Sequence, residues 1–150
     1  MHEKLVRQKT QFENALARFQ ELLEPMIVSS DNGAYNLILK WLGNGDYNKG
    51  IAYVNEIFNK NGYNFKVGDI YAVGHSFEKS TVSPDAVSRM MVELFNGTYS
   101  KPEINATVLD LLEKSTKRLG EMAFYGVPSK IKIYAAKHSE AENNYALTLV

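Results

Sequence analysis

The 150-residue chain contains no cysteine, which excludes disulfide bonds, zinc sites built on thiolates and catalysis by a thiol. Its 17 basic and 17 acidic residues balance, so no basic excess exists to neutralise a phosphate backbone, and nucleic acid is not expected as a partner. No apolar run is long enough to cross a bilayer, and the charged residues 1–7 do not resemble a signal peptide. The three histidines lack metal-ligand spacing, so we predict neither a metal nor a cofactor.

The chain does contain a series of amphipathic helices. The spacing of apolar residues and the capping signals predict helices over 3–24, 33–42, 47–60, 84–95 and 102–119. Pro25 is expected to end the first of them, because proline cannot donate the backbone hydrogen bond that continues a helix, and to begin a short helical piece over 26–29. Apolar residues expected to face the core include Leu37, Trp41, Ile57, Phe95 and Ile104. Residues 63–82 show neither helical nor strand periodicity in their apolar residues, so we expect a long ordered loop there. Long loops in compact domains are usually functional.

Two stretches near the C-terminus, 130–136 and 145–150, alternate apolar and polar residues and predict an antiparallel β-hairpin. The sequence therefore indicates a single α+β domain over 1–150, in several layers, that is mainly helical over 1–125 and forms the hairpin over 126–150. Because the apolar pattern of the second strand runs to the last residue, we expect an incomplete sheet. Its unpaired edge predicts self-association.

Two short motifs carry the chemical information. Ser30-Asp31-Asn32 precedes the predicted helix 33–42, in the context Met-Ile-Val-Ser-Ser-Asp-Asn-Gly-Ala-Tyr-Asn, and Lys137-His138-Ser139 follows an apolar strand roughly a hundred residues later. Ser-Asp-Asn by itself is also a common helix cap. The two motifs in this order resemble the second and third signatures of class A β-lactamases and penicillin-binding D,D-peptidases. This resemblance implies a β-lactamase/transpeptidase-like fold, of which the chain holds mainly the helical subdomain.

The resemblance also implies roles for the residues of both motifs. Ser30 would pass a proton to the leaving nitrogen, Asn32 would bind the acyl-amide side of the substrate, and Asp31 would hold the turn. Lys137 would supply positive charge for the substrate carboxylate. His138 and Ser139 stand at substrate-binding positions where the family has threonine or serine and then glycine.

The first signature of that family, Ser-x-x-Lys, is absent upstream of Ser30, because no serine precedes Ser29. Matches at Ser76 to Lys79 and Ser129 to Lys132 come after the second motif, in the wrong order. The acids of the predicted loop are Asp69 and Glu78. The chain is therefore expected to be a fragment or an inactive form.

Three functions remain open. The first is a serine hydrolase that acts on β-lactams or D-Ala-D-Ala amides by acyl-serine transfer, with a small β-lactam or a peptidoglycan stem peptide as its partner. By resemblance, such a protein would work outside the cytoplasmic membrane. The second is a noncatalytic module that binds peptidoglycan or protein on the same scaffold. The third is a helical structural domain whose motif matches are coincidental.

Overall fold

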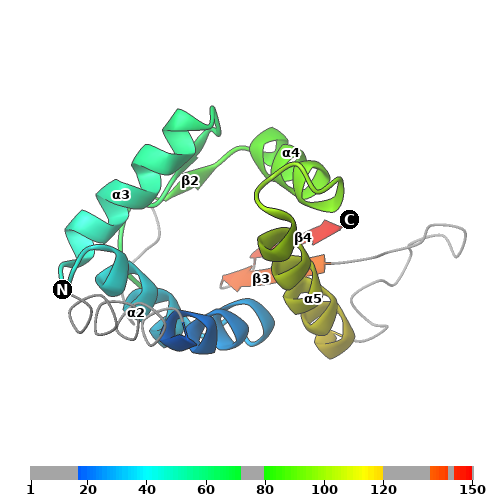
Figure 1. Cartoon of the computed structure of the whole chain (residues 1–150), viewed down its shortest axis with the longest axis horizontal. Helices are drawn as coiled ribbons and strands as arrows, with labels where there is room; N and C mark the ends of the chain where they lie inside the picture. Colours follow the sequence, from blue (N-terminus) through cyan, green and yellow to red (C-terminus); the bar gives the residue numbers. More distant parts are fainter. Residues whose placement is uncertain (1–16, 72–79, 120–135, 142–143, 150) are drawn as a thin grey trace, which may run out of the picture.

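Helices dominate the computed structural model, which describes residues 17–71, 80–119, 136–141 and 144–149 (Figure 1). The helices are 17–28, α2 (Asn32–Leu42), α3 (Tyr47–Lys60), α4 (Pro84–Phe95) and α5 (Pro102–Leu119). The strands are β1 (Phe65–Lys66), β2 (Thr81–Val82), β3 (Ala136–Ala141) and β4 (Asn144–Leu149). β1 pairs with β2 and β3 pairs with β4, both antiparallel. The α+β class predicted from the sequence is confirmed.

Helices α2 and α3 each begin at an aspartate cap, and they pack as a hairpin in which glycine lets their backbones touch. Asp31 Oδ1 accepts a hydrogen bond from the Ala34 amide at 2.8 Å, and Asp46 Oδ1 accepts one from the Asn48 amide at 2.9 Å. At Gly50 a Cβ atom would lie 1.9 Å from the Leu39 carbonyl oxygen. Only glycine fits this contact, so Gly50 fixes the position of α2 against α3.

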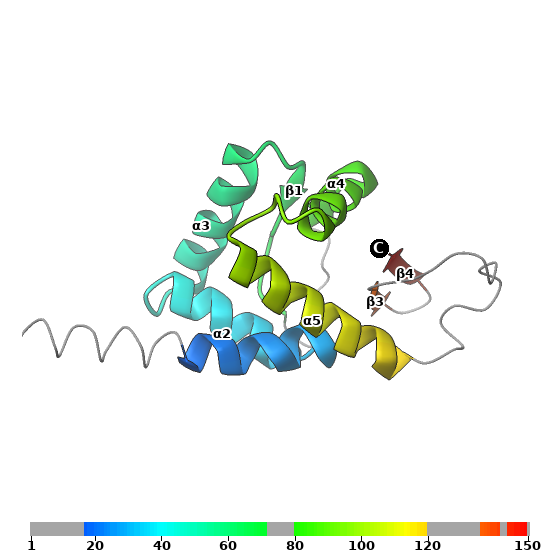
Figure 2. The same cartoon turned by 45° about the vertical axis from the view of Figure 1, so that its right-hand side comes forward.

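The principal apolar core lies where α4, α5 and helix 17–28 meet (Figure 2). Leu94 of α4 and Leu112 of α5 are buried, and Ile27 packs against them from helix 17–28. An ion pair between Lys114 and Glu24, 3.8 Å apart, joins α5 to the same helix at the surface. Helix 17–28 thus leads the chain out of this core to the start of α2.

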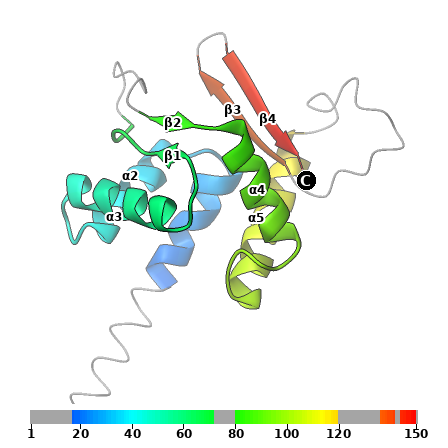
Figure 3. The same ribbon diagram turned by 90° about the horizontal axis from the view of Figure 1, so that it is seen from above.

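The β3–β4 hairpin lies beside α5 and α4, as the view in Figure 3 shows. Its register pairs Lys137 with Thr148, His138 with Leu147 and Ser139 with Ala146. The second predicted strand, 145–150, agrees with β4 to within a residue at each end. The predicted strand 130–136 shares only Ala136 with β3, and its residues 130–135 lie outside the described part of the chain.

The prediction that Pro25 ends the first helix is wrong. Residues 17–28 are helical through Pro25, while residues 3–16 of the predicted helix lie outside the described residues. Because Pro25 stands in the final turns, its missing N–H affects only the end of the hydrogen-bond ladder. Its carbonyl oxygen still accepts bonds from the amides of Ser29 and Asp31, and Ile27 adds core packing beyond it.

The predicted inward faces of the helices are also partly wrong. Leu37 and Trp41 of α2 are 50% and 48% exposed, whereas Leu39 is buried in their place. Trp41 instead stacks on Phe19, with ring centroids 5.2 Å apart. Three other apolar residues predicted to face the core are likewise exposed: Ile57, Phe95 and Ile104. These helices pack mostly in pairs, so each buries a narrower stripe than a helix surrounded by neighbours.

Candidate functional site

The second motif lies at the exposed N-terminus of α2. Ser30, Asp31 and Asn32 are all exposed, and the Ser29 and Asp31 amides both donate to the Pro25 carbonyl oxygen. Between them Ser30 adopts a φ of 54°, in the left-handed region that few residues other than glycine occupy. The sequence folds this way because helix 17–28 must end and α2 must begin within three residues. The motif therefore sits in a tight, solvent-accessible turn, with Asp31 as the helix cap.

Segment 67–71 of the predicted loop packs against α2 and α3 through reciprocal side-chain bonds. Asn36 of α2 donates from Nδ2 to the Tyr71 carbonyl at 2.7 Å and accepts at Oδ1 from the Tyr71 amide at 2.8 Å. Asn55 of α3 makes the same pair of bonds with Val67, both 2.8 Å long. Each asparagine thus pairs with a loop residue as a neighbouring strand would.

The middle of segment 67–71 is held as well. The Tyr35 hydroxyl donates to the Asp69 carbonyl oxygen at 3.2 Å, and Ser80 Oγ accepts from the Gly68 amide at 3.0 Å. Asp69 folds its carboxylate back to accept from the Ile70 amide at 2.8 Å. Burial, and next the negative charge of Asp69, raise the pKa of Tyr35, which keeps its hydroxyl protonated as a donor.

The base of the loop is closed by β1 and β2, where Phe65 pairs with Val82 and Lys66 with Thr81. The predicted loop 63–82 therefore contains two short strands that the sequence analysis missed. Its residues 72–79, among them His75, Ser76, Glu78 and Lys79, lie outside the described residues. Two-residue strands leave no periodic signal, so only the pairing reveals them.

A polar cluster anchors the start of the loop to α4. The Tyr63 hydroxyl donates to Glu93, while Arg89 stacks 4.3 Å from the centroid of the Tyr63 ring and donates to the Asn61 carbonyl at 3.0 Å. The Tyr63 side chain is only 6% exposed. This burial, followed by the hydrogen bond to Glu93, raises the pKa of Tyr63 to about 12. Tyr63 therefore stays protonated at physiological pH and anchors the loop to α4 as a hydrogen-bond donor.

The third motif, Lys137-His138-Ser139, lies inside β3, whereas it was expected in the turn that follows the predicted strand 130–136. The alternating pattern did not extend over 137–141, because this stretch is polar and becomes a strand through its pairing with β4. The structure therefore places the two motifs on separate elements, α2 and β3. The convergence of Ser30 and Lys137 on one cleft stays a prediction, as do the chemical roles of Asn32, His138 and Ser139.

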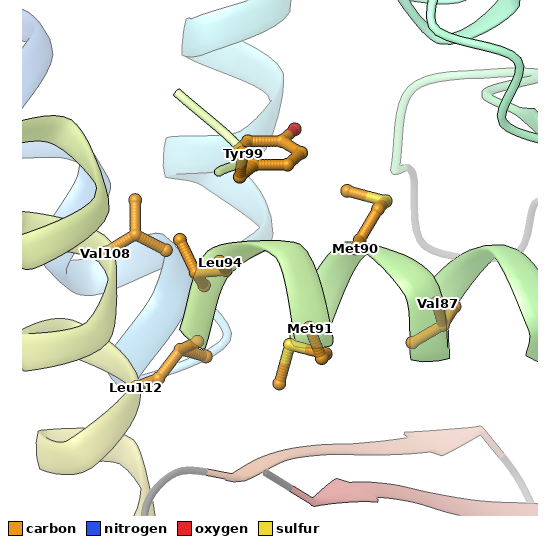
Figure 4. Close-up of a pocket in the computed structure, with 7 residues that line it drawn as sticks. All are labelled: Val87, Met90, Met91, Leu94, Tyr99, Val108 and Leu112. Carbon is orange, nitrogen blue, oxygen red and sulfur yellow. The ribbon is translucent and has the colours of Figure 1, made fainter. Parts of the chain in front are cut away.

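An apolar cavity of about 270 Å³ opens between α4 and α5 (Figure 4). The residues that line it are Val87, Met90, Met91, Leu94, Tyr99, Val108 and Leu112. Apart from the Tyr99 hydroxyl, this lining offers no acid, base or nucleophile, and burial raises the pKa of that hydroxyl as well. These lining residues come from α4, α5 and the segment between them, and none of them belongs to either motif.

Asn55 is the residue of this region that the sequence analysis missed. The sequence feature that could have identified Asn55 is its position as a polar residue between Val54 and Phe58, on the side of helix 47–60 that was predicted to face inward. Within the described ranges, no group of three histidines, cysteines or acids could hold a metal ion. No helix in those ranges is long and apolar enough to cross a membrane.

The fold and the two motifs define an α+β protein of mainly helical build with an exposed Ser-Asp-Asn turn. A model of the β-lactamase enzyme family matches residues 7–142, and the chain belongs to this family. No curated protein and no solved structure gave a significant match. The family membership supports a serine hydrolase-like scaffold.

Proposed function

We propose that the chain carries part of the acyl-transfer site of a serine hydrolase that acts on β-lactams or D-Ala-D-Ala amides. The observation that carries this proposal is the exposed Ser30-Asp31-Asn32 turn at the start of α2, in a chain of the β-lactamase enzyme family. A hydroxyl in such a turn can pass a proton to a leaving nitrogen, and an amide beside it can bind the acyl group. Ser30 and Asn32 take these roles.

Lys137, in β3, would supply the positive charge that attracts the substrate carboxylate. His138 and Ser139 would line the same strand beside the bound substrate. These residues are proposed to belong to one domain over 1–150 that lacks the Ser-x-x-Lys part of the family. Because peptidoglycan lies outside the cytoplasmic membrane, the proposed place of action is extracytoplasmic.

No serine precedes Ser29 in these 150 residues, so we expect the chain by itself to bind a β-lactam without forming an acyl-enzyme. A labelled penicillin tests this in two ways. Intact-mass measurement reports a covalent adduct, and fluorescence anisotropy reports reversible binding. The expected result is binding with no adduct.

The matched variants Lys137→Ala and Lys101→Ala distinguish an interaction of Lys137 with the ligand from an effect of the net charge of the protein. Both remove one positive charge, but Lys101 stands before α5, in another part of the chain from either motif. Lys137→Ala should weaken penicillin binding by about tenfold, the value of one charge-assisted hydrogen bond, and Lys101→Ala should leave it unchanged. A stoichiometric adduct on the wild-type chain would overturn the noncovalent mode. Absence of binding to both a penicillin and a D-Ala-D-Ala peptide would overturn the proposed function.

A noncatalytic binding module is the second candidate, and the identity of residues 138 and 139 favours it. His138 and Ser139 replace a hydroxyl residue and a glycine of the family signature, which alters the strand along which substrate would lie. Reversible binding of a muropeptide, together with no affinity for any penicillin, would favour this second function.

A further inference from the structure

We propose that Asn55 of α3 is a positioning residue that, with Asn36 of α2, preorganises segment 67–71 as one wall of the β-lactam site. The inference rests on the proposed function. It starts from an unusual feature of the loop, in which the backbone of an irregular segment bonds to side chains where a strand or helix would supply backbone partners. An irregular segment held in this way keeps its shape only as long as those side chains are present.

The two asparagines grip the segment at its ends. Asn55 binds both the N–H and the C=O of Val67, and Asn36 binds both groups of Tyr71. Both asparagines are half-buried, as are Asp69 and Tyr71, and Val67 is buried. In such surroundings a lost partner leaves a backbone group unsatisfied, so each pair of bonds restrains the segment strongly.

The side chains of α2 that hold segment 67–71 lie close to the second motif. Tyr35 and Asn36, which hold Asp69 and Tyr71, come five and six residues after Ser30. Counted from Asn32, the first residue of α2, the separation is three and four residues, or roughly 5 to 6 Å along the helix, which is within the length of a penicillin or a dipeptide. Segment 67–71, with Asp69 at its middle, is therefore held within reach of a ligand at Ser30 and Asn32.

Preorganisation predicts an effect on affinity. If segment 67–71 were free, a ligand would have to order it on binding, and affinity would fall by the corresponding entropy. Asn55 is the sharper test of the two asparagines, because it lies on α3 and acts on the site only through Val67. A change in affinity on its removal thus reports the position of the segment and not a lost contact with the ligand.

The experiment compares Asn55→Ala with Asn48→Ala, which removes an exposed asparagine from the same helix. The rate of amide hydrogen exchange at Val67 reports how firmly Asn55 holds this residue, an interaction we call the asparagine clamp. The Kd for a labelled penicillin reports the affinity of the proposed site. Both are measured well below the melting temperature of each variant. Asn55→Ala should speed exchange at Val67 and weaken penicillin binding by about tenfold each. Asn55→Asp, which keeps the acceptor for the Val67 amide but loses the donor, should be intermediate. Asn48→Ala should change neither quantity.

A purely structural role for Asn55 gives a different result. It would lower the melting temperature and leave the Kd of the folded protein within about twofold of wild type, which would overturn the proposal. If the rate of amide exchange at Val67 is the same in Asn55→Ala as in wild type, Asn55 does not restrain Val67 and the proposal is overturned. A wild-type chain with no affinity for penicillin would overturn the proposed function and, with it, the role of Asn55 in binding. The exchange and affinity measurements therefore distinguish these failures.

Discussion

Replacement of Gly50 by alanine tests the contact that sets α2 against α3. On helix propensity alone this change would stabilise the protein by about 1 kcal/mol, because alanine loses less backbone entropy than glycine in a helix. The structure predicts the opposite sign. The new Cβ would lie 1.9 Å from the Leu39 carbonyl oxygen and 2.7 Å from its carbon, which are backbone atoms that no rotamer change can move.

The magnitude follows from that overlap. A carbon and a carbonyl oxygen approach to about 3.3 Å at the closest, so α2 and α3 must separate by roughly 1 Å or more. Overpacking of this kind costs about 3 kcal/mol at the upper end of its usual range. After the gain in propensity is subtracted, Gly50→Ala should lower the free energy of unfolding by about 2 kcal/mol.

Urea denaturation followed by circular dichroism measures this difference. Ala52→Gly is the control, because Ala52 is exposed on the same helix and reports the propensity term alone, an expected loss of about 1 kcal/mol. The same displacement of α2 from α3 should also speed amide exchange at Val67 and Tyr71, which asparagines on these two helices hold. A Gly50→Ala protein that is as stable as wild type, or more so, would refute the close approach of the two helices.

Three other results are expected. Asp31→Ala should cost about 1 kcal/mol in urea denaturation through loss of the cap on α2, whereas Asp31→Asn should stay near wild type; equal losses in both variants would contradict the capping role. Because the pKa of Tyr63 is raised to about 12, the stability that depends on its neutral hydroxyl is fully present below pH 10 and is lost as the pH rises from 10 to about 12. The stability gap between wild type and Tyr63→Phe should therefore close over that range, and a constant gap would argue against the anchor. Among the strands described, β3 and β4 pair only with each other, so light scattering should show self-association at high concentration; a clean monomer would count against an adhesive edge.

The helices from α2 to α5 were predictable from the sequence because local signals mark their ends. Asp46, Ser83 and Pro84 start helices, and Asn61 and Asn96 follow the last residues of α3 and α4. These effects act within one turn of helix and need no tertiary partner. The α+β class followed from the same signals, together with the alternating pattern of β4.

The errors lie where partners from other elements decide the structure. The exposure of Leu37 and the burial of Leu39 depend on the close approach at Gly50, which helical periodicity does not reveal. β3 is polar and becomes a strand by pairing with β4. The asparagine clamps join positions 12 and 35 residues apart, so no local pattern marks Asn55 as a partner of Val67. Ser30, Asn32 and Lys137 were found only because the motifs they belong to resemble known signatures.

We propose that the Ser30-Asp31-Asn32 turn, segment 67–71 and the third motif in β3 form one β-lactam site. Titration of the isotope-labelled chain with benzylpenicillin, followed residue by residue through its backbone amide signals, tests this most directly. Saturable shifts are expected at residues 30–36, 67–71 and 137–139, with no change in the intact mass of the protein. Shifts confined to the apolar cavity around Met90 and Met91, or no shifts at all, would contradict it.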